Sequence, residues 1–182
     1  MESSPTTTFG WVYFLAEKYS GMFIEGTWIT LYIAVLGTLL GFALGFMIGV
    51  IQDSKISQHD NTVKKMLMRI LKIISTVYVE VFRDTPMIVQ AMIVYYGLRQ
   101  TTLGAHMTPV FAGILVTVLN TGAYMAETVR GGIGSIDKGQ REGAWAMGMS
   151  TIKTMIFVVL PQAFKNIIPE MANTFLTNLK MT

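Results

Sequence analysis

Residues 26–51 form a run without a single charged side chain, and this run limits what the chain can fold into. A helix of about 20 apolar residues is long enough to cross the hydrocarbon core of a bilayer. Of the 182 residues, 52% are hydrophobic and 14% are charged, whereas a typical soluble domain carries about 25% charged residues. We therefore expect an all-α protein in a cell membrane, built as a multi-pass bundle of transmembrane helices.

Four glycines are spaced by four residues within this first predicted span: Gly37, Gly41, Gly45 and Gly49. That spacing places them on one face of a helix, where small residues allow the backbone of a second helix to come close. Each glycine costs about 1 kcal/mol of helix propensity relative to alanine. The sequence therefore predicts a helix-packing face here rather than a surface that faces lipid.

The next segment, residues 52–72, is polar and basic, and its apolar residues recur at helical spacing. This pattern predicts an amphipathic helix at the membrane interface that leads into the next span. Loops rich in lysine and arginine lie on the cytoplasmic side. Because Lys18 is the one cation before residue 26, we expect the N-terminus to be extracytoplasmic.

Two further spans are predicted over residues 73–98 and 109–129, with residues 99–108 as a short outer loop. The second span contains Arg83 and Pro86, and the proline is expected to bend its helix. Ionisable side chains at membrane depth usually face the protein interior or a water-filled path. Arg83 is therefore a candidate partner for a substrate carboxylate. The alternative is an internal ion pair with Asp84, Glu80 or Glu127.

The third span carries Asn120, Tyr124 and Glu127 at positions i, i+4 and i+7, which lie on one helical face. An amide, a phenol and a carboxylate along a translocation path can hydrogen-bond an amino acid. Glu127 can pair with the ammonium group of that substrate. The alternative is an ion pair between Glu127 and Arg130, three residues further on.

Residues 131–161 are expected to form a cytoplasmic loop. Ser135 can cap a short helix with Asp137 in its first turn, and Gly148 suits its end. A second short helix is predicted from Ser150 or Thr151 to about Pro161. A fourth span is predicted over residues 163–182.

Three motifs of the chain, at residues 82–90, 123–133 and 142–163, together resemble a known family. Residues 142–148, followed by 160–163, resemble the EAA loop of ABC importer permeases. Residues 123–133 and 82–90 resemble the branch of that family that handles polar amino acids, where a glycine usually stands at the position of Asp84. Gly143 also departs from the family pattern, which has an alanine there, and this change is expected to loosen the loop helix.

The resemblance implies an importer permease fold whose loop helix docks into an ATPase subunit. Small residues, an acidic residue and a large aromatic anchor form the coupling element: Gly139, Glu142, Gly143, Ala144, Trp145 and Gly148. The alternative is an ordinary amphipathic loop on the membrane surface. Family members continue beyond Lys180, so the fourth span is expected to be incomplete and a last span to be missing.

The partners that the resemblance implies are ABC ATPase subunits, an extracytoplasmic amino-acid-binding protein, a second identical or related permease chain, and membrane lipid. The expected function is the ATP-driven import of polar amino acids. The alternatives are a truncated membrane subunit that docks an ATPase without transporting and, less consistent with an EAA-like loop, a secondary carrier.

Several classes of function are not expected. The sequence has no glycine-rich phosphate loop of the Walker type, so ATP is expected to bind to the partner ATPase, and the chain itself is not expected to be an enzyme or to hold a cofactor. The net charge of +3 is small and scattered, which argues against nucleic acid as a partner. The two histidines, His59 and His106, fall in loops predicted on opposite sides of the membrane, so no metal site is expected.

Overall fold

A computed structural model describes residues 7–54, 61–102 and 104–182, and within these ranges every regular element is a helix. The predicted all-α class is therefore confirmed. The α-helices and two π-helical turns follow one another as α1 (Thr8–Lys18), α2 (Ser20–Asp53), α3 (Thr62–Asp84), α4 (Met87–Met92), η1 (Ile93–Gly97), α5 (Pro109–Gly134), α6 (Lys138–Ala146), α7 (Thr151–Thr154), η2 (Met155–Val159) and α8 (Leu160–Met181).

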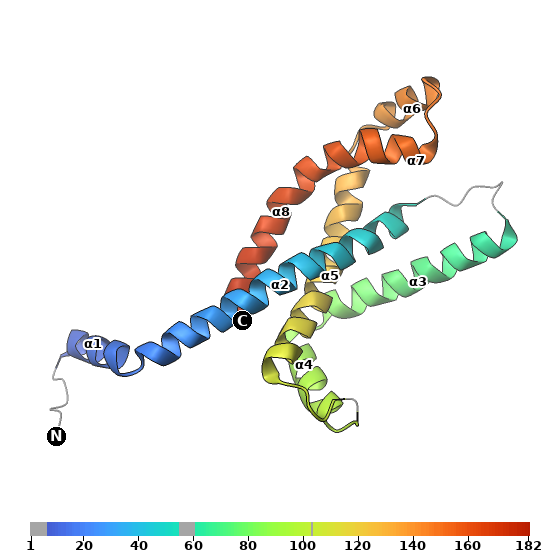
Figure 1. Ribbon diagram of the computed structural model, residues 1–182. Helices are drawn as coiled ribbons and strands as arrows, with labels where there is room; N and C mark the ends of the chain where they lie inside the picture. The colour runs from blue at the N-terminus through green and yellow to red at the C-terminus, as the bar shows by residue number, and fades with distance from the viewer. Residues whose placement is uncertain (1–6, 55–60, 103) are drawn as a thin grey trace.

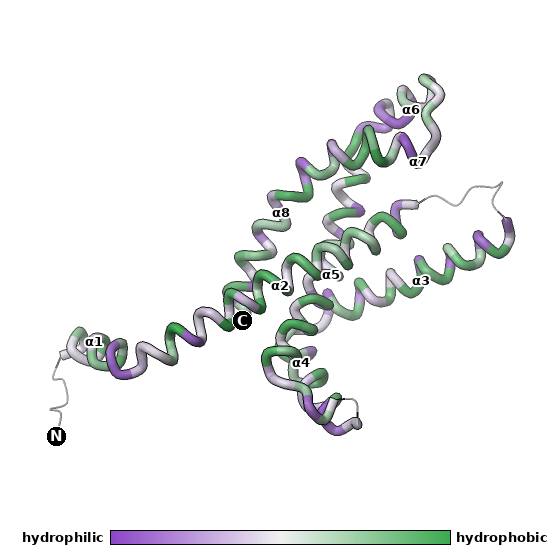
Figure 2. Tube along the Cα trace, in the orientation of Figure 1, coloured by the Kyte–Doolittle hydropathy of each residue, from purple (hydrophilic) through white to green (hydrophobic). Residues whose placement is uncertain are grey.

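Three helical segments of the described chain are long and apolar enough to cross a membrane: Ser20–Asp53, Pro109–Gly134 and Thr151–Met181. The first two contain the spans predicted over residues 26–51 and 109–129. Figure 1 shows α5 crossing α2, with α8 on the other side of α5 from α3. In Figure 2 the middle of α2 is largely hydrophobic, whereas α6 is largely hydrophilic.

The predicted glycine face of α2 is buried against α5. Gly37 meets Thr117, Gly41 meets Thr121, Gly45 meets Met125 and Gly49 meets Val129.

From one of these contacts to the next, the residue number rises by four in both helices, so the chain runs in the same direction through α2 and α5. A Cβ atom added at Gly45 would lie 2.5 Å from the Cβ of Met125 and 2.6 Å from the carbonyl oxygen of Gly122. The two backbones are therefore as close as glycine allows.

The segment predicted as one span over residues 73–98 is divided in the structure. Helix α3 begins at Thr62, within the segment predicted to be amphipathic (residues 52–72), and ends at Asp84. Thr85 is extended, as expected for a residue before proline. The chain resumes with α4 and η1, which form a shorter apolar helix over Met87–Gly97. Pro86 therefore breaks this helix instead of only bending it.

The helix predicted to end near Pro161 continues through it. Helix α7, the π-helical turn η2 and α8 form one unbroken run from Thr151 to Met181. Pro161 occupies the first turn of α8, directly after the wider turn of η2. In η2 the amide of Leu160 bonds to the carbonyl of Met155, so the hydrogen-bond pattern is already shifted just before Pro161 and its missing N–H group does not interrupt the helix. The predicted fourth span, residues 163–182, is thus the second part of a longer helix.

Helices α2, α5 and α8 share an apolar core in which Val129, Ile133 and Ile167 are completely or almost completely buried. A buried polar contact joins the same three helices. The side-chain nitrogen of Asn178 in α8 donates to the hydroxyl oxygens of Thr38 in α2, at 2.9 Å, and Thr121 in α5, at 3.0 Å. Three spans therefore meet at one amide group.

Helices α6 and α7 lie together at one end of the structure, and α1 lies at the opposite end of α2 (Figure 1). The C-terminal end of α2 is the end nearer to α6 (Figure 1). Residues 55–60, part of the predicted basic loop, lie outside the described residues, and so does His59.

The close approach of α2 and α5 predicts opposite effects for two identical substitutions in α2. Gly45→Ala should lower the thermal unfolding temperature in detergent, because overpacking a tight contact costs about 1–3 kcal/mol. Gly26→Ala is the control, since a Cβ there meets nothing within 4 Å, and it should leave stability unchanged or raise it. A Gly45→Ala protein as stable as the Gly26→Ala protein would contradict this packing.

Candidate functional site

A cavity of about 500 Å³ lies between the α3–α4 junction, α5 and α8. Its volume is in the range of small-molecule sites in proteins. It lies near the middle of α5, because Asn120, Thr121 and Tyr124 of that helix line it. The junction contributes Arg83, Asp84 and the Thr85–Pro86 break, and α8 contributes polar side chains that include Glu170, Asn173 and Asn178.

The charges on the wall of this cavity are of both signs. Arg83 is its cation, and Asp84 and Glu170 are its carboxylates. Amide and hydroxyl groups of α5 and α8 provide further donors and acceptors. The lining therefore suits a small polar solute that carries a positive and a negative group.

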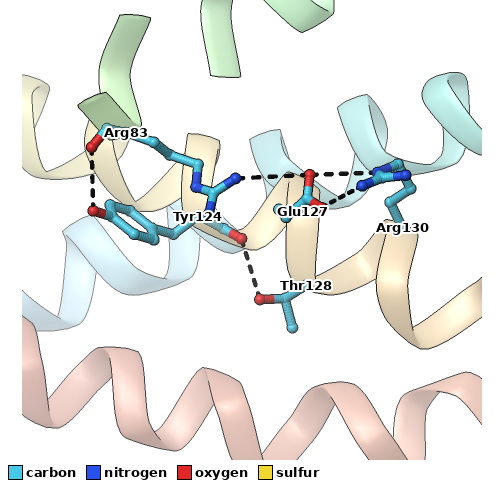
Figure 3. A network of polar contacts seen from close by, with 5 residues as sticks. All are labelled: Arg83, Tyr124, Glu127, Thr128 and Arg130. Atoms are coloured by element: carbon cyan, nitrogen blue, oxygen red, sulfur yellow. Dashed lines mark hydrogen bonds and ion pairs between the residues drawn. The ribbon is translucent and has the colours of Figure 1, made fainter. Parts of the chain in front are cut away.

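Arg83, Tyr124, Glu127 and Arg130 form a connected row beside the cavity (Figure 3). The guanidinium carbon of Arg83 lies 5.6 Å from the centre of the Tyr124 ring, which is within the range of a cation–π contact. The Nη1 atom of Arg83 lies 3.8 Å from Oε2 of Glu127. Arg130 donates two hydrogen bonds to the same carboxylate, one of them at 3.3 Å. Both internal pairs that the sequence left open for Glu127 therefore exist in one structure.

A second cavity, also of about 500 Å³, lies between α2, α3 and α5. Glu127 and Arg130 line it together with Lys72 and Glu80, and Arg83 lines both cavities. Of the four predicted pathway residues, Asn120, Tyr124 and Arg83 thus line the first cavity, and Glu127 lines the second. The side chain of Arg83 stands between the two spaces.

Asn120 also has a structural task that the sequence did not predict. Its side-chain nitrogen donates to the carbonyl of Phe82 at 3.1 Å and to Oε1 of Gln90 at 3.3 Å. Gln90 donates in turn to the carbonyls of Phe82, at 2.9 Å, and Thr85, at 3.0 Å. The last carbonyls of a helix have no partners within it, so these two amides stabilise the broken end of α3.

The polar face of α8 is the main part of the cavity that sequence reasoning missed. Glu170, Asn173, Thr174, Thr177 and Asn178 recur at intervals of three and four, which is the signal of one helical face. This spacing within the predicted fourth span is the sequence signal that indicates the polar face. Gln90 gave no comparable signal, because its role depends on the break at Pro86.

The short helix predicted within the loop is present as α6, but its cap differs from the prediction. The side chain of Asp137 accepts a hydrogen bond from the amide of Gly139 at 2.6 Å. Ser135 does not cap α6. Its hydroxyl donates to the carbonyl of Gly132 in the last turn of α5 and accepts a hydrogen bond from Asn166 at 3.0 Å. An aspartate at the N-cap satisfies the free amides better here because Ser135 still belongs to the end of α5.

The C-terminal end of α6 is closed as predicted by Gly148, which has a φ of +81°. Its amide donates to the carbonyl of Trp145 at 2.9 Å, and the amide of Met149 donates to Ala144 at 3.0 Å. This pair of hydrogen bonds is a Schellman motif, which favours glycine at the left-handed position. At Gly143 a Cβ would meet nothing within 4 Å, so the alanine usual in the family would fit there.

Helix α6 has an inner and an outer face. Ala144 is 2% exposed, and Arg141 of the same face lies against the rest of the protein. Trp145 is 42% exposed, and Glu142 is exposed too. Part of a large aromatic ring and a carboxylate are thus exposed on a short, capped helix.

Comparison with known proteins connects this architecture to one family. A family model described as "binding-protein-dependent transport system inner membrane component" matches residues 63–182. The arginine transport system permease protein ArtQ of Bacillus subtilis is 40% identical over 157 residues, which are 86% of this chain and 66% of that protein. The glutamine transport system permease protein GlnP of Escherichia coli K12 is 32% identical over 163 residues, which are 88% of this chain and 68% of that protein. The chain thus spans about two thirds of the length of these relatives.

Solved structures agree with this result. The crystal structure of an amino acid ABC transporter with histidines superposes with a TM-score of 0.76 at 35% identity, covering 90% of this chain and 70% of that one. An inward-facing MetNI methionine ABC transporter superposes with a TM-score of 0.67 at 22% identity, covering 87% and 70%, which supports the fold alone.

Proposed function

We propose that this chain, which belongs to the family of binding-protein-dependent transport system inner membrane components, is the permease subunit of an ATP-driven ABC importer for polar amino acids. The observation that carries the proposal is the combination of a polar cavity between membrane-spanning helices with a capped helix, α6, that presents Trp145 outward. Relatives named as arginine and glutamine permeases support the substrate class. They do not favour a membrane subunit that docks an ATPase without transporting.

The first cavity supplies complementary groups for a free amino acid. Arg83 suits the substrate carboxylate, and Glu170 or Asp84 suits the ammonium group. The amide oxygen of Asn120 and the hydroxyl of Tyr124 can hydrogen-bond a polar side chain, because the amide nitrogen of Asn120 already donates to Phe82 and Gln90. The two carboxylates and one guanidinium of the wall favour substrates with an additional positive charge. Glu127, in the second cavity, would contact the substrate after it passes Arg83.

The partners belong to the same proposal. ATPase subunits would bind ATP and hold the outer face of α6, which includes Glu142 and Trp145. An extracytoplasmic binding protein would deliver the amino acid, and a second permease chain would complete the assembly. Transport requires that the substrate and ATP stabilise different conformations of the permease to different degrees.

An uptake assay tests the substrate class. The intact permease, reconstituted in liposomes with its ATPase and binding protein, should accumulate labelled arginine, lysine, histidine or glutamine in an ATP-dependent manner and should not accumulate leucine. Glu170→Gln should raise the KM for a cationic amino acid about tenfold, because it removes a charged partner. Glu17→Gln, the same change in the exposed helix α1, is the control. Leucine as the preferred substrate, or equal KM values for both variants, would contradict the assignment.

The coupling role of α6 predicts different effects for two tryptophans of similar exposure. Trp145→Ala should weaken binding of the ATPase about tenfold or more, because aromatic anchors dominate interface energetics. Glu142→Lys should act in the same direction. Trp11→Ala is the control, since Trp11 is 44% exposed but lies on α1 at the opposite end of α2. Pull-down of the ATPase by the Trp145→Ala permease at wild-type strength would exclude this docking surface.

The proposed orientation places the N-terminus and residues 99–108 outside and α6 in the cytoplasm, because the cations gather on the α6 side. The chain has no cysteine, so single cysteines report accessibility directly. In intact cells an impermeant thiol reagent should label Thr102→Cys but not Met147→Cys, which should react after the membrane is opened. The reverse pattern would invert the topology.

A further inference from the structure

Arg141 links the inner face of α6 to two membrane-spanning helices at once. Its Nη2 atom donates to the carbonyl oxygen of Ile133, in the last turns of α5, at 3.2 Å. The same atom lies 3.6 Å from Oδ2 of Asp53, the last residue of α2. Each of the two charged side chains is 17% exposed. Arg141 is therefore an ion-pair partner inside the protein and does not belong to the outer surface that carries Trp145.

The opposite charges of Arg141 and Asp53 attract each other, but the two side chains do not form a hydrogen bond. A hydrogen bond between these groups requires a distance of about 2.7–3.2 Å, and Oδ2 of Asp53 is buried without a hydrogen-bond partner among the described residues. Leaving a buried carboxylate oxygen unpaired is unfavourable. A small displacement of α6 toward α2 would bring the guanidinium within hydrogen-bonding distance of Oδ2 of Asp53.

The end of α2 is anchored from its other side. The ammonium group of Lys72 in α3 donates to the carbonyl of Gln52 at 3.0 Å and to that of Ser54. These bonds hold the residues on either side of Asp53 against α3. Along its length α2 is held to α5 by the glycine face. Asp53 therefore presents a carboxylate from a fixed position, and α6 is the partner that can approach it.

We infer that the Asp53–Arg141 pair is the contact through which movement of α6 is transmitted to α2 and, through the glycine face, to α5. This inference rests on the proposed function. Pressure from an ATP-loaded ATPase on the outer face of α6 closes the pair into a hydrogen-bonded ion pair, and release of nucleotide lets it reopen. Arg141 is a positioning residue in this description, because it acts on the transport pathway through α2.

The first test measures coupling in the intact permease with its ATPase and binding protein in liposomes. Asp53→Asn and Arg141→Gln should each leave ATPase pull-down unchanged but lower the amount of amino acid transported per ATP about five- to tenfold, the size of a typical coupling energy. The exchange Asp53→Arg with Arg141→Asp, or the conservative change Arg141→Lys, should restore part of it. Lys165→Gln, which removes an exposed cation of α8, is the control and should match the wild type.

The second test needs no transport. Spin labels at Met47 of α2, which is 61% exposed, and at Met147, the residue directly after α6, which is 78% exposed, report the separation of the two helices in the permease–ATPase complex. A non-hydrolysable ATP analogue should shorten the distance in the wild type and leave it unchanged in Arg141→Gln.

Each negative result has a distinct meaning. A wild-type distance that does not respond to nucleotide, or single variants that transport as much per ATP as the wild type, would overturn this inference. A distance response without uptake of any amino acid would support the inference and refute the proposed substrate class.

Discussion

The contact of α2 with α5 is the constraint on which the rest of the structure depends. Because glycines at every fourth position have no side chains, α2 approaches α5 until backbone meets Cβ, and the two helices become one unit. Helix α8 then packs on this pair through an apolar core, and Tyr78 of α3 attaches to it by donating to the carbonyl of Leu119 at 2.6 Å. Inside a bilayer the hydrophobic effect does not distinguish helix from lipid, so close packing of this kind determines which helices associate.

Features encoded within one helix could be predicted from the sequence. The charge-free run, the four-residue glycine spacing and the glycine at the end of α6 each depend on neighbouring residues, and each agrees with the structure. Features for which the local sequence allows two conformations, such as the choice of a cap residue or the effect of a proline, were predicted less well. Asp137 and Ser135 both suit a cap, and the length of α5 decides between them. Pro86 breaks a helix whereas Pro161 does not, because an extended residue precedes the first and a π-helical turn precedes the second.

The candidate site was also predicted only in part: residues that share one helix face were found, and contacts between distant segments were not. Asn120 and Tyr124 were predicted from their shared face, and the structure places both on the wall of one cavity. Gln90, which bonds to Asn120, and the cavity-lining residues Glu170 and Asn178 were not predicted, because they come from segments that the sequence does not align with α5. Arg83 was left with several possible partners, and the structure gives it Tyr124 and Glu127 together. Contacts between distant segments depend on how helices are arranged, which periodicity within a helix does not record.

The amide of Asn178 has a mechanical consequence. Its two hydrogen bonds to Thr38 and Thr121 are enclosed by three helices, and Asn178 is 4% exposed. Sliding α8 by one turn would leave an amide and two hydroxyls buried without partners, whereas tilting α8 about this point keeps both bonds. The triad therefore acts as a pivot. The contacts of this helix with α6 lie in η2, several turns before the pivot, so a small tilt at the pivot produces a larger displacement at the α6 end.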